Sequence, residues 1–440
     1  LWFLDQLESD NPAYNIGRAV RLLGPLDLQV LQQCLDEIVR RHEILRTNFV
    51  MVEGQPVQVI APGRSVPLPV LDLRGSHDGQ HLVMVEKLVN EESRRPFDLE
   101  RDLLFRAKLL WLQEQDHVLI LTMHHSASDG WSIRVLFREI SILYGSFSHG
   151  AESPLPEPPI QYADFAVWQR EWLQGETLEA LLRYWRKQLA GSPLVLELPT
   201  DRPRPALQTH RGAGEELLLV KPLTQELKAL CHREDVTLYI LLLAAFGVLL
   251  HRYTRQEDIL IGSPISGRDQ FEVEGLIGFF LNTLVLRSKP TRDQSFRQYL
   301  HQLRDRVLSG FAHQVIPFEA LLQKLQIERS LSRTPLFQAM FVLHDAVPPL
   351  LRLPDMQADW LEINRGGAMF DLTLVARDTD EGLSLTLRYS TDLFDSATIR
   401  QMLRHLQTLL ESIVTGPELS IWQLPLLLAT ERQQLLVDWN

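Results

Sequence analysis

Residues 118–132 have the sequence VLILTMHHSASDGWS, an apolar run followed by polar residues and a glycine. The run 118–123 does not alternate between apolar and polar residues, which is typical of a strand buried on both faces. Asp129 and Ser132 have the residue types and the spacing of a helix N-terminus. The stretch therefore predicts a buried strand, a polar turn and a helix, with two adjacent histidines where the strand meets the turn.

The two histidines, His124 and His125, point to opposite faces because side chains alternate along a strand. One ring can therefore face a cleft, where a neutral imidazole takes a proton from an attacking amine or hydroxyl near neutral pH. Asp129 can orient a ring or pair with a cation, and Gly130 allows a carbonyl or oxyanion to approach its backbone N–H. The alternative is a purely structural role, in which both histidines form internal hydrogen bonds at the strand end and Asp129 only caps the helix. A zinc site is disfavoured because the rings diverge and no clear third ligand is present.

The composition restricts the classes of protein that the chain can belong to. With 440 residues, 45% hydrophobic and 23% charged, it is neither disordered nor a coiled coil nor collagen-like. Its formal charge of −12 argues against nucleic-acid or anionic-membrane binding. Its two cysteines, Cys34 and Cys231, suit a reducing compartment, so we expect a cytoplasmic protein. The longest apolar run, 239–250, is shorter than the roughly 18 residues of a membrane span and predicts a buried helix.

Strand-like and helix-like stretches alternate along the chain and then repeat. The sequence DGWSIR at Asp129 begins a helix in the first half, and DSATIR at Asp395 begins one in the second. The repeat indicates two related lobes with a cleft between them, unless the two helix starts are alike by chance. The breaker-rich stretches 153–159 and 196–205 place the lobe boundary in this region. We predict strands at 19–23, 43–50, 56–60, 103–112, 217–220 and 258–262, and helices after Pro25, at 178–189 and after Pro222.

Several motifs resemble those of condensation domains of nonribosomal peptide synthetases, whose fold is like chloramphenicol acetyltransferase. HHSASDGWS at residue 124 is similar to the HHxxxDG motif of that family. Ser330 departs from the family, which usually has an acidic residue there. The further matches are LWFLDQL at residue 1, RHEILRTNF at 41, YADFAVWQ at 162, IGFFLNTLVLR at 277, HQVIPFE at 313, RSLSRTPLFQ at 329 and LPLLLATERQQLLVDWN at 424.

The resemblance implies an α/β (α+β) protein of two chloramphenicol acetyltransferase-like lobes, in a V-shaped pseudo-dimer with a central tunnel. We expect an N-terminal lobe over 1–175 that carries the HHxxxDG motif. A C-terminal lobe with bridging segments follows over 176–425, and the start of a linker to an adenylation domain over 426–440. The ends of the chain suggest one part of a longer synthetase.

The resemblance also assigns roles within the motif. It implies that His125 is the catalytic histidine and His124 its more structural neighbour. Asp129 is expected to be structural and paired with an arginine, for which Arg46 and Arg287 are the candidates. Gly130 is expected to present its backbone N–H to a thioester carbonyl.

Outside these four residues we place three in substrate binding, namely Trp131, Asn282 and Ser390. Arg333 joins Arg46 and Arg287 among the structural residues. Ser390 occupies the position of His124 when Asp395 is aligned with Asp129, so the chemistry is expected on one lobe only. No metal ligand is assigned.

The implied reaction is amide formation between an upstream acyl or peptidyl thioester and a downstream aminoacyl thioester. Both substrates are carried on phosphopantetheine arms of peptidyl carrier proteins, and no cofactor is expected to bind tightly. The excised domain is expected to be monomeric, without a nucleic-acid or membrane partner, and to be most like the subtype that joins two L-residues. The alternatives are a starter domain that adds a fatty or polyketide chain, a coenzyme A-dependent acyltransferase and a non-catalytic docking domain.

Overall fold

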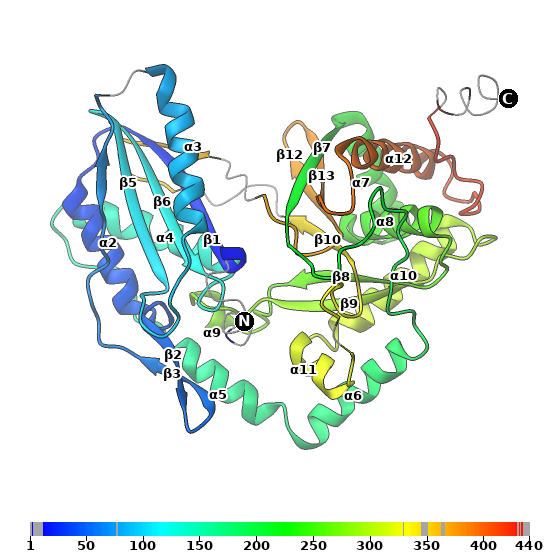
Figure 1. The fold of residues 1–440 in the computed structure, drawn as a ribbon, viewed down its shortest axis with the longest axis horizontal. Helices are drawn as coiled ribbons and strands as arrows, with labels where there is room; N and C mark the ends of the chain where they lie inside the picture. Colours follow the sequence, from blue (N-terminus) through cyan, green and yellow to red (C-terminus); the bar gives the residue numbers. More distant parts are fainter. Residues whose placement is uncertain are drawn as a thin grey trace. The chain divides into compact units, whose positions relative to one another are not determined.

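The computed structural model consists of two compact units (Figure 1). Unit 1 comprises Leu1–Trp172, Ser266–Leu281 and Val347–Arg365, and unit 2 comprises Leu173–Ile265, Asn282–Ala346 and Gly366–Asn440. Unit 1 thus includes two segments from the range that we assigned to the second lobe, and the lobe limits 1–175, 176–425 and 426–440 stay a prediction. The structure describes residues 2, 12–75, 78–328, 330–344, 351–361, 366–428, 431 and 433.

The sheet of unit 1 has the strand order β11-β1-β6-β5-β4, in which only β4 and β5 pair in parallel. Every residue of β6 is buried, which confirms the predicted strand at 118–123. Helices α2 and α4 pack on one face and α3 packs on the other, so β6 is covered on both faces (Figure 1). The strands are β1 Asn15–Leu23, β4 Val70–Asp72, β5 Phe105–Gln113, β6 Asp116–His124 and β11 Gln357–Leu361.

The helices α2 and α4 of unit 1 begin after aspartates whose side chains cap them. Asp27 accepts hydrogen bonds from the N–H groups of Gln29 and Val30 and begins α2, as the sequence predicted. The helices are α2 Leu28–Arg41, α3 Asp78–Arg94, α4 Gly130–Phe147, α5 Tyr162–Trp172 and α9 Phe271–Glu274, with 3₁₀ turns η1 Pro12–Tyr14 and η2 Glu43–Arg46.

The predicted strand over 43–50 is wrong in its first half. Residues 43–46 form η2, because the Thr47 hydroxyl donates to the Glu43 carbonyl and closes a local turn. Ile44 and Leu45 are buried in this turn, so an apolar pair that suggested a strand serves a 3₁₀ helix instead. The hairpin that follows is confirmed, with β2 at Thr47–Val52 and β3 at Gln55–Ile60.

The sheet of unit 2 has the order β7-β13-β12-β10-β8-β9. Its helices α7, α8, α10 and α12 share one apolar core with the sheet. The strands are β7 Gly212–Val220, β8 Ile259–Ile265, β9 Asn282–Ser288, β10 Ala339–His344, β12 Leu372–Thr379 and β13 Gly382–Ser390. The helices are α6 Gly175–Leu189, α7 Lys221–Glu234, α8 Leu238–Thr254, α10 Phe296–Phe311, α11 Phe318–Lys324 and α12 Ser396–Thr415.

The apolar run at 239–250 forms the buried helix α8, as predicted. Thr237 caps this helix by accepting the N–H of Ile240. In the described part of the chain, no single helix is long and apolar enough to cross a membrane. Within that part, only the bent pair α7–α8 reaches the required length and apolar composition when its two helices are taken together. Cys34 and Cys231 are both buried free thiols.

The two sheets repeat one arrangement of four strands. The order β4-β5-β6-β1 in unit 1 corresponds to β10-β12-β13-β7 in unit 2. In each set the first pair is parallel and the next two pairs are antiparallel. A helix follows β6 and another follows β13 after a turn of five residues. The α/β fold class is therefore confirmed, whereas the V-shaped pseudo-dimer and its tunnel stay predictions.

Candidate active site

The histidine pair lies at the end of β6, in the turn that leads to α4. His124 is the last residue of the strand, and its N–H donates to the carbonyl of Leu104 at 3.1 Å. The chain then turns through a bond of 3.0 Å from the Ala127 N–H to the His124 carbonyl and enters α4 at Gly130. The local order of strand, turn and helix is the one that the sequence predicted.

The His124 side chain is buried and neutral. Its Nδ1 accepts the backbone N–H of Ser126 at 3.2 Å and lies 2.7 Å from the Ser126 hydroxyl, so the ring proton is on Nε2. Burial lowers the pKa of His124 to about 4, and the charges of His125 and Arg106 act in the same direction. An imidazole with this pKa is uncharged at neutral pH and supports the turn.

The His125 ring is only partly buried and has the opposite tautomer. Its Nδ1 lies 2.9 Å from the carbonyl oxygen of Ser128. Because a carbonyl can only accept, Nδ1 carries the proton and Nε2 is the basic nitrogen of the neutral ring. The ring packs perpendicular to Phe279, at 83° with 5.1 Å between the centroids. The two adjacent histidines thus lie in different surroundings, as the alternation of a strand requires.

Asp129 connects the turn to the 266–281 segment of unit 1. Its carboxylate accepts the N–H of Ser132 at 2.8 Å, and the Ser132 hydroxyl oxygen accepts the N–H of Asp129 at 3.2 Å, which together form a capping box at the start of α4. The same hydroxyl lies 2.7 Å from the Asp129 carboxylate. The same carboxylate accepts the N–H of Phe280 at 3.0 Å and pairs with Arg268 at 3.2 Å. Both charged side chains are almost fully buried, at 2% and 0% exposure, so the pair is a structural link.

The predicted ion pair exists, but both proposed cations were wrong. Arg46 pairs with Glu43 at 3.2 Å, and Arg287 binds Asp258 through two hydrogen bonds of 2.8 and 2.5 Å. Each of these carboxylates is close by, in the same turn or beside the neighbouring strand, and it satisfies its arginine locally. Arg268 lies in an irregular loop outside the motifs that resemble the family, where no local pattern distinguishes one arginine from another.

Gly130 and Trp131 occupy the first turn of α4. The N–H groups of a helix's first turn have no intrahelical acceptor, and the N-terminus carries partial positive charge. Gly130 is exposed, and a Cβ added to it would meet no heavy atom within 4 Å. The indole N–H of Trp131 donates to the Glu274 carbonyl at 2.9 Å. The helix start thus offers donors beside open space, while Trp131 uses its polar group within the unit.

Three further predicted residues belong to unit 2 and have structural contacts there. The Asn282 amide donates to the carbonyls of Gln314 and Ile316 and accepts two backbone N–H groups, which uses its hydrogen-bonding capacity. Ser390 is buried at the end of β13. Arg333 lies 3.7 Å from Glu197, a partly exposed ion pair.

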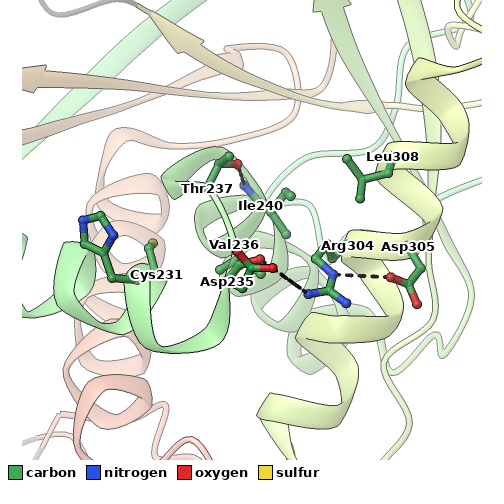
Figure 2. Close-up of a pocket in the computed structure, with 9 residues that line it drawn as sticks. Cys231, Asp235, Val236, Thr237, Ile240, Arg304, Asp305 and Leu308 are labelled. Carbon is green, nitrogen blue, oxygen red and sulfur yellow. Dashed lines mark hydrogen bonds and ion pairs between the residues drawn. The ribbon is translucent and has the colours of Figure 1, made fainter.

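A surface pocket of about 400 Å³ lies in unit 2, between residues of α7, α8 and α10 (Figure 2). Its cation, Arg304, faces Asp235 at 3.8 Å and Asp305 at 3.3 Å, so the charges compensate one another. Burial raises the pKa of the Cys231 thiol to about 11, so the thiolate is scarce at neutral pH. The pocket contains no predicted site residue and offers no activated nucleophile.

The described residues also contain no group of three or more His, Cys, Asp or Glu side chains arranged to hold a metal ion. The motif at residue 1 and the end of the chain lie mostly outside the described residues.

A comparison with family models identifies the family of the chain that carries this site. The family model of the condensation domain matches residues 1–436. The chain belongs to the condensation domain family. Condensation domains of nonribosomal peptide synthetases are acyltransferases that form amide bonds, and they work with carrier-protein and adenylation domains.

Similar proteins are large synthetases. The condensation domain is 44% identical over 442 residues to one of the linear gramicidin synthase proteins of Brevibacillus parabrevis, matching all of this chain and 9% of that protein. It is 39% identical to phosphinothricin tripeptide synthetase PhsC of Streptomyces viridochromogenes, matching 99% of this chain and 40% of that protein. The condensation domain thus spans less than half the length of these relatives.

A solved structure supports the same fold. The X-domain from teicoplanin biosynthesis is 28% identical in sequence, with a TM-score of 0.88 over 97% of this chain and 95% of that one. Similarity over nearly the full length of both chains shows that the two share one fold.

Proposed function

We propose that this condensation domain transfers an upstream acyl or peptidyl group to the amine of a downstream aminoacyl group. Each substrate is a thioester on the phosphopantetheine arm of a carrier protein. The amine nitrogen attacks the thioester carbonyl, the C–N bond forms, the C–S bond breaks and the upstream thiol is released. The observation that carries the proposal is the contact of His125 Nδ1 with the Ser128 carbonyl, which leaves Nε2 as the basic nitrogen within an intact HHxxxDG motif.

In this proposal each residue of the motif has a separate role. His125 Nε2 accepts a proton from the attacking ammonium or holds the amine by a hydrogen bond. His124 stays neutral and supports the turn, and Asp129 holds the turn to Arg268. The N–H of Gly130 donates to the oxygen of the thioester carbonyl as negative charge develops there.

The partners and the setting follow from the family. We propose that phosphopantetheine arrives with the carrier proteins as part of the substrate and that no cofactor is resident. An adenylation domain follows in the synthetase, both joined residues have the L configuration, and the excised domain is monomeric and cytoplasmic. These proposals rest on the resemblance of the motifs and on the synthetases that the chain matches.

The test is an intact-mass assay of the wild-type chain with two carrier proteins, one loaded with an L-aminoacyl donor and one with an L-aminoacyl acceptor. We expect the acceptor carrier to gain the donor's mass while the donor carrier returns to its free thiol. A parallel reaction replaces the donor with a fatty acyl carrier or an acyl-coenzyme A. Transfer from either replacement but not from the aminoacyl carrier would support a starter domain or a coenzyme A-dependent acyltransferase instead.

A further inference from the structure

The aromatic ring of Phe279 is a neighbour of His125 that the proposed mechanism does not use. The two rings are perpendicular, with centroids 5.1 Å apart, and both side chains are partly buried. Phe279 belongs to the 266–281 segment, which lies far from β6 in the sequence but in the same unit. Its contact with the histidine therefore depends on how this segment is held.

Side chains of unit 1 hold the peptide group that joins Phe279 to Phe280. The hydroxyl of Tyr162 donates to the Phe279 carbonyl at 2.9 Å, and the next N–H, that of Phe280, donates to Asp129 at 3.0 Å. The preceding residue, Gly278, leaves no room for a side chain, because a Cβ there would lie 2.4 Å from the Tyr162 ring. The backbone at Phe279 is thus fixed by two hydrogen bonds and by a close approach.

The backbone on the N-terminal side of Phe279 is held by buried polar groups. The hydroxyl oxygen of Ser132 accepts the Gly278 N–H at 3.1 Å and lies 2.9 Å from the Gly278 carbonyl oxygen. Arg268 donates to the Leu276 carbonyl at 2.7 Å. A buried serine hydroxyl in contact with both polar groups of one residue restricts the position of that residue.

Ile277, the residue before Gly278, is held by a buried polar group that consists of Arg41, His42 and Glu139. The N–H of Ile277 donates to Nδ1 of His42 at 3.3 Å, and Nε2 of the same ring lies 3.0 Å from Glu139. Arg41 lies 3.3 Å from the same carboxylate, and the exposure of the three polar side chains is 4%, 1% and 3%. Burial alone would raise the pKa of Glu139, but His42 and Arg41 together lower it, so the carboxylate stays charged.

We propose that Phe279 is a positioning residue for His125, and that the Arg41–His42–Glu139 group and Tyr162 set its place. The inference rests on the proposed function of His125. The Ser128 carbonyl defines one edge of the imidazole, and the Phe279 ring stands against it at a right angle. Together they restrict rotation of the imidazole and keep the direction of Nε2 constant. Neither contact supplies or removes a proton, so Phe279 acts through His125 and not on the substrate.

The test compares Phe279→Leu with Phe279→Tyr in the full chain, using the aminoacyl carrier assay. Leucine fills a similar volume without a flat ring, whereas tyrosine keeps the ring. We expect Phe279→Leu to lower kcat by roughly tenfold to a hundredfold with an unchanged KM, because small misplacement of a catalytic group has effects of that size. Phe279→Tyr should keep kcat within about threefold of wild type. Phe271→Ala, at an 84% exposed position in the same segment, is the matched control and should behave as wild type.

A second readout does not depend on turnover. The ¹⁵N chemical shifts of the His125 ring, assigned by their loss in His125→Ala, report the tautomer. We expect the protonated Nδ1 form in wild type and in Phe279→Tyr, and a mixture of tautomers in Phe279→Leu. A purely structural role would lower the melting temperature of Phe279→Leu and leave the tautomer as in wild type.

The outcomes separate this inference from the proposed function. Wild-type kcat and ring shifts in Phe279→Leu would overturn the positioning role while amide formation still stands. A rise in KM at constant kcat would assign Phe279 to substrate contact and would also overturn it. Failure of the wild-type chain to transfer the aminoacyl donor would instead contradict the proposed function, whatever the ring shifts show.

Discussion

The turn after β6 and the turn after β13 have the same length and the same place in two sheets of matching strand order. The first contains His125 and ends at Asp129, whereas the second begins at Thr391 and ends at Asp395. Both aspartates precede a helix, but only Asp129 forms a capping box. Asp395 is 55% exposed and pairs with Arg202.

The same order of strand, turn and helix thus occurs with a buried aspartate in unit 1 and with an exposed aspartate in unit 2. In unit 2, Asp201 lies beside the helix start, where it accepts the N–H of Asp395 at 2.7 Å and the Thr398 hydroxyl at 2.9 Å. In unit 1 the aspartate is buried against Arg268. The difference comes from the segment that packs on each turn, because the local sequences DGWSIR and DSATIR are alike.

The largest difference between the turns should be chemical. His125→Ala is expected to lower the rate of amide formation by roughly 10² to 10⁴, the usual contribution of an acid–base residue. Thr391→Ala changes the corresponding position in unit 2 and should leave the rate unaffected. Intact-mass measurement of the loaded carriers checks both variants. Full activity in folded His125→Ala would remove the histidine from the mechanism.

The second difference should appear in stability. Asp129→Asn leaves the Arg268 charge buried without its partner and should lower the free energy of unfolding by about 3–5 kcal/mol. Asp395→Asn removes an exposed ion pair and should cost less than about 1 kcal/mol. Urea unfolding of the two variants measures both values. Equal losses would contradict the contrast between a buried link and an exposed helix start.

The third difference should appear as pH dependence, because unit 2 has Ser390 where unit 1 has His124. The pKa of His124 falls from 6.5 to about 4 on folding, so the unfolded chain binds the additional proton between these values. Stability should therefore fall as the pH falls from 6.5 to 4, by about 3 kcal/mol for this group. We expect His124→Ser to lose that part of the pH dependence when unfolding is measured across the range. An identical slope in wild type and variant would place the His124 pKa near its ordinary value.

The smallest expected effect concerns the start of α4. Gly130→Ala adds a methyl group in open space at the first helical residue, so the fold should be unchanged. If the thioester oxygen binds the N–H there, the methyl group should hinder its approach and lower kcat/KM by about tenfold. Gly145→Ala, in the same helix and also beside open space, is the control. Wild-type kcat/KM in both variants would exclude a substrate contact at Gly130.

Much of the fold could be predicted because burial and capping have short-range signatures. The unbroken apolar run indicated that β6 is covered on both faces, and Asp27 and Asp129 marked the starts of α2 and α4. The prediction failed at residues 43–46, where a buried Ile-Leu pair fits a 3₁₀ turn as well as a strand. An apolar pair of that length has no period to distinguish the two.

The candidate site was predictable only in part. The sequence by itself determined the strand, the turn and the helix start, together with the two histidines and the family, because each depends on residues within a few positions of one another. Only the tertiary structure decided that Arg268 pairs with Asp129, that Phe279 stands against His125 and that His42 holds Ile277. These contacts join residues separated by more than a hundred positions, and no local periodicity encodes which distant segment will pack on a turn.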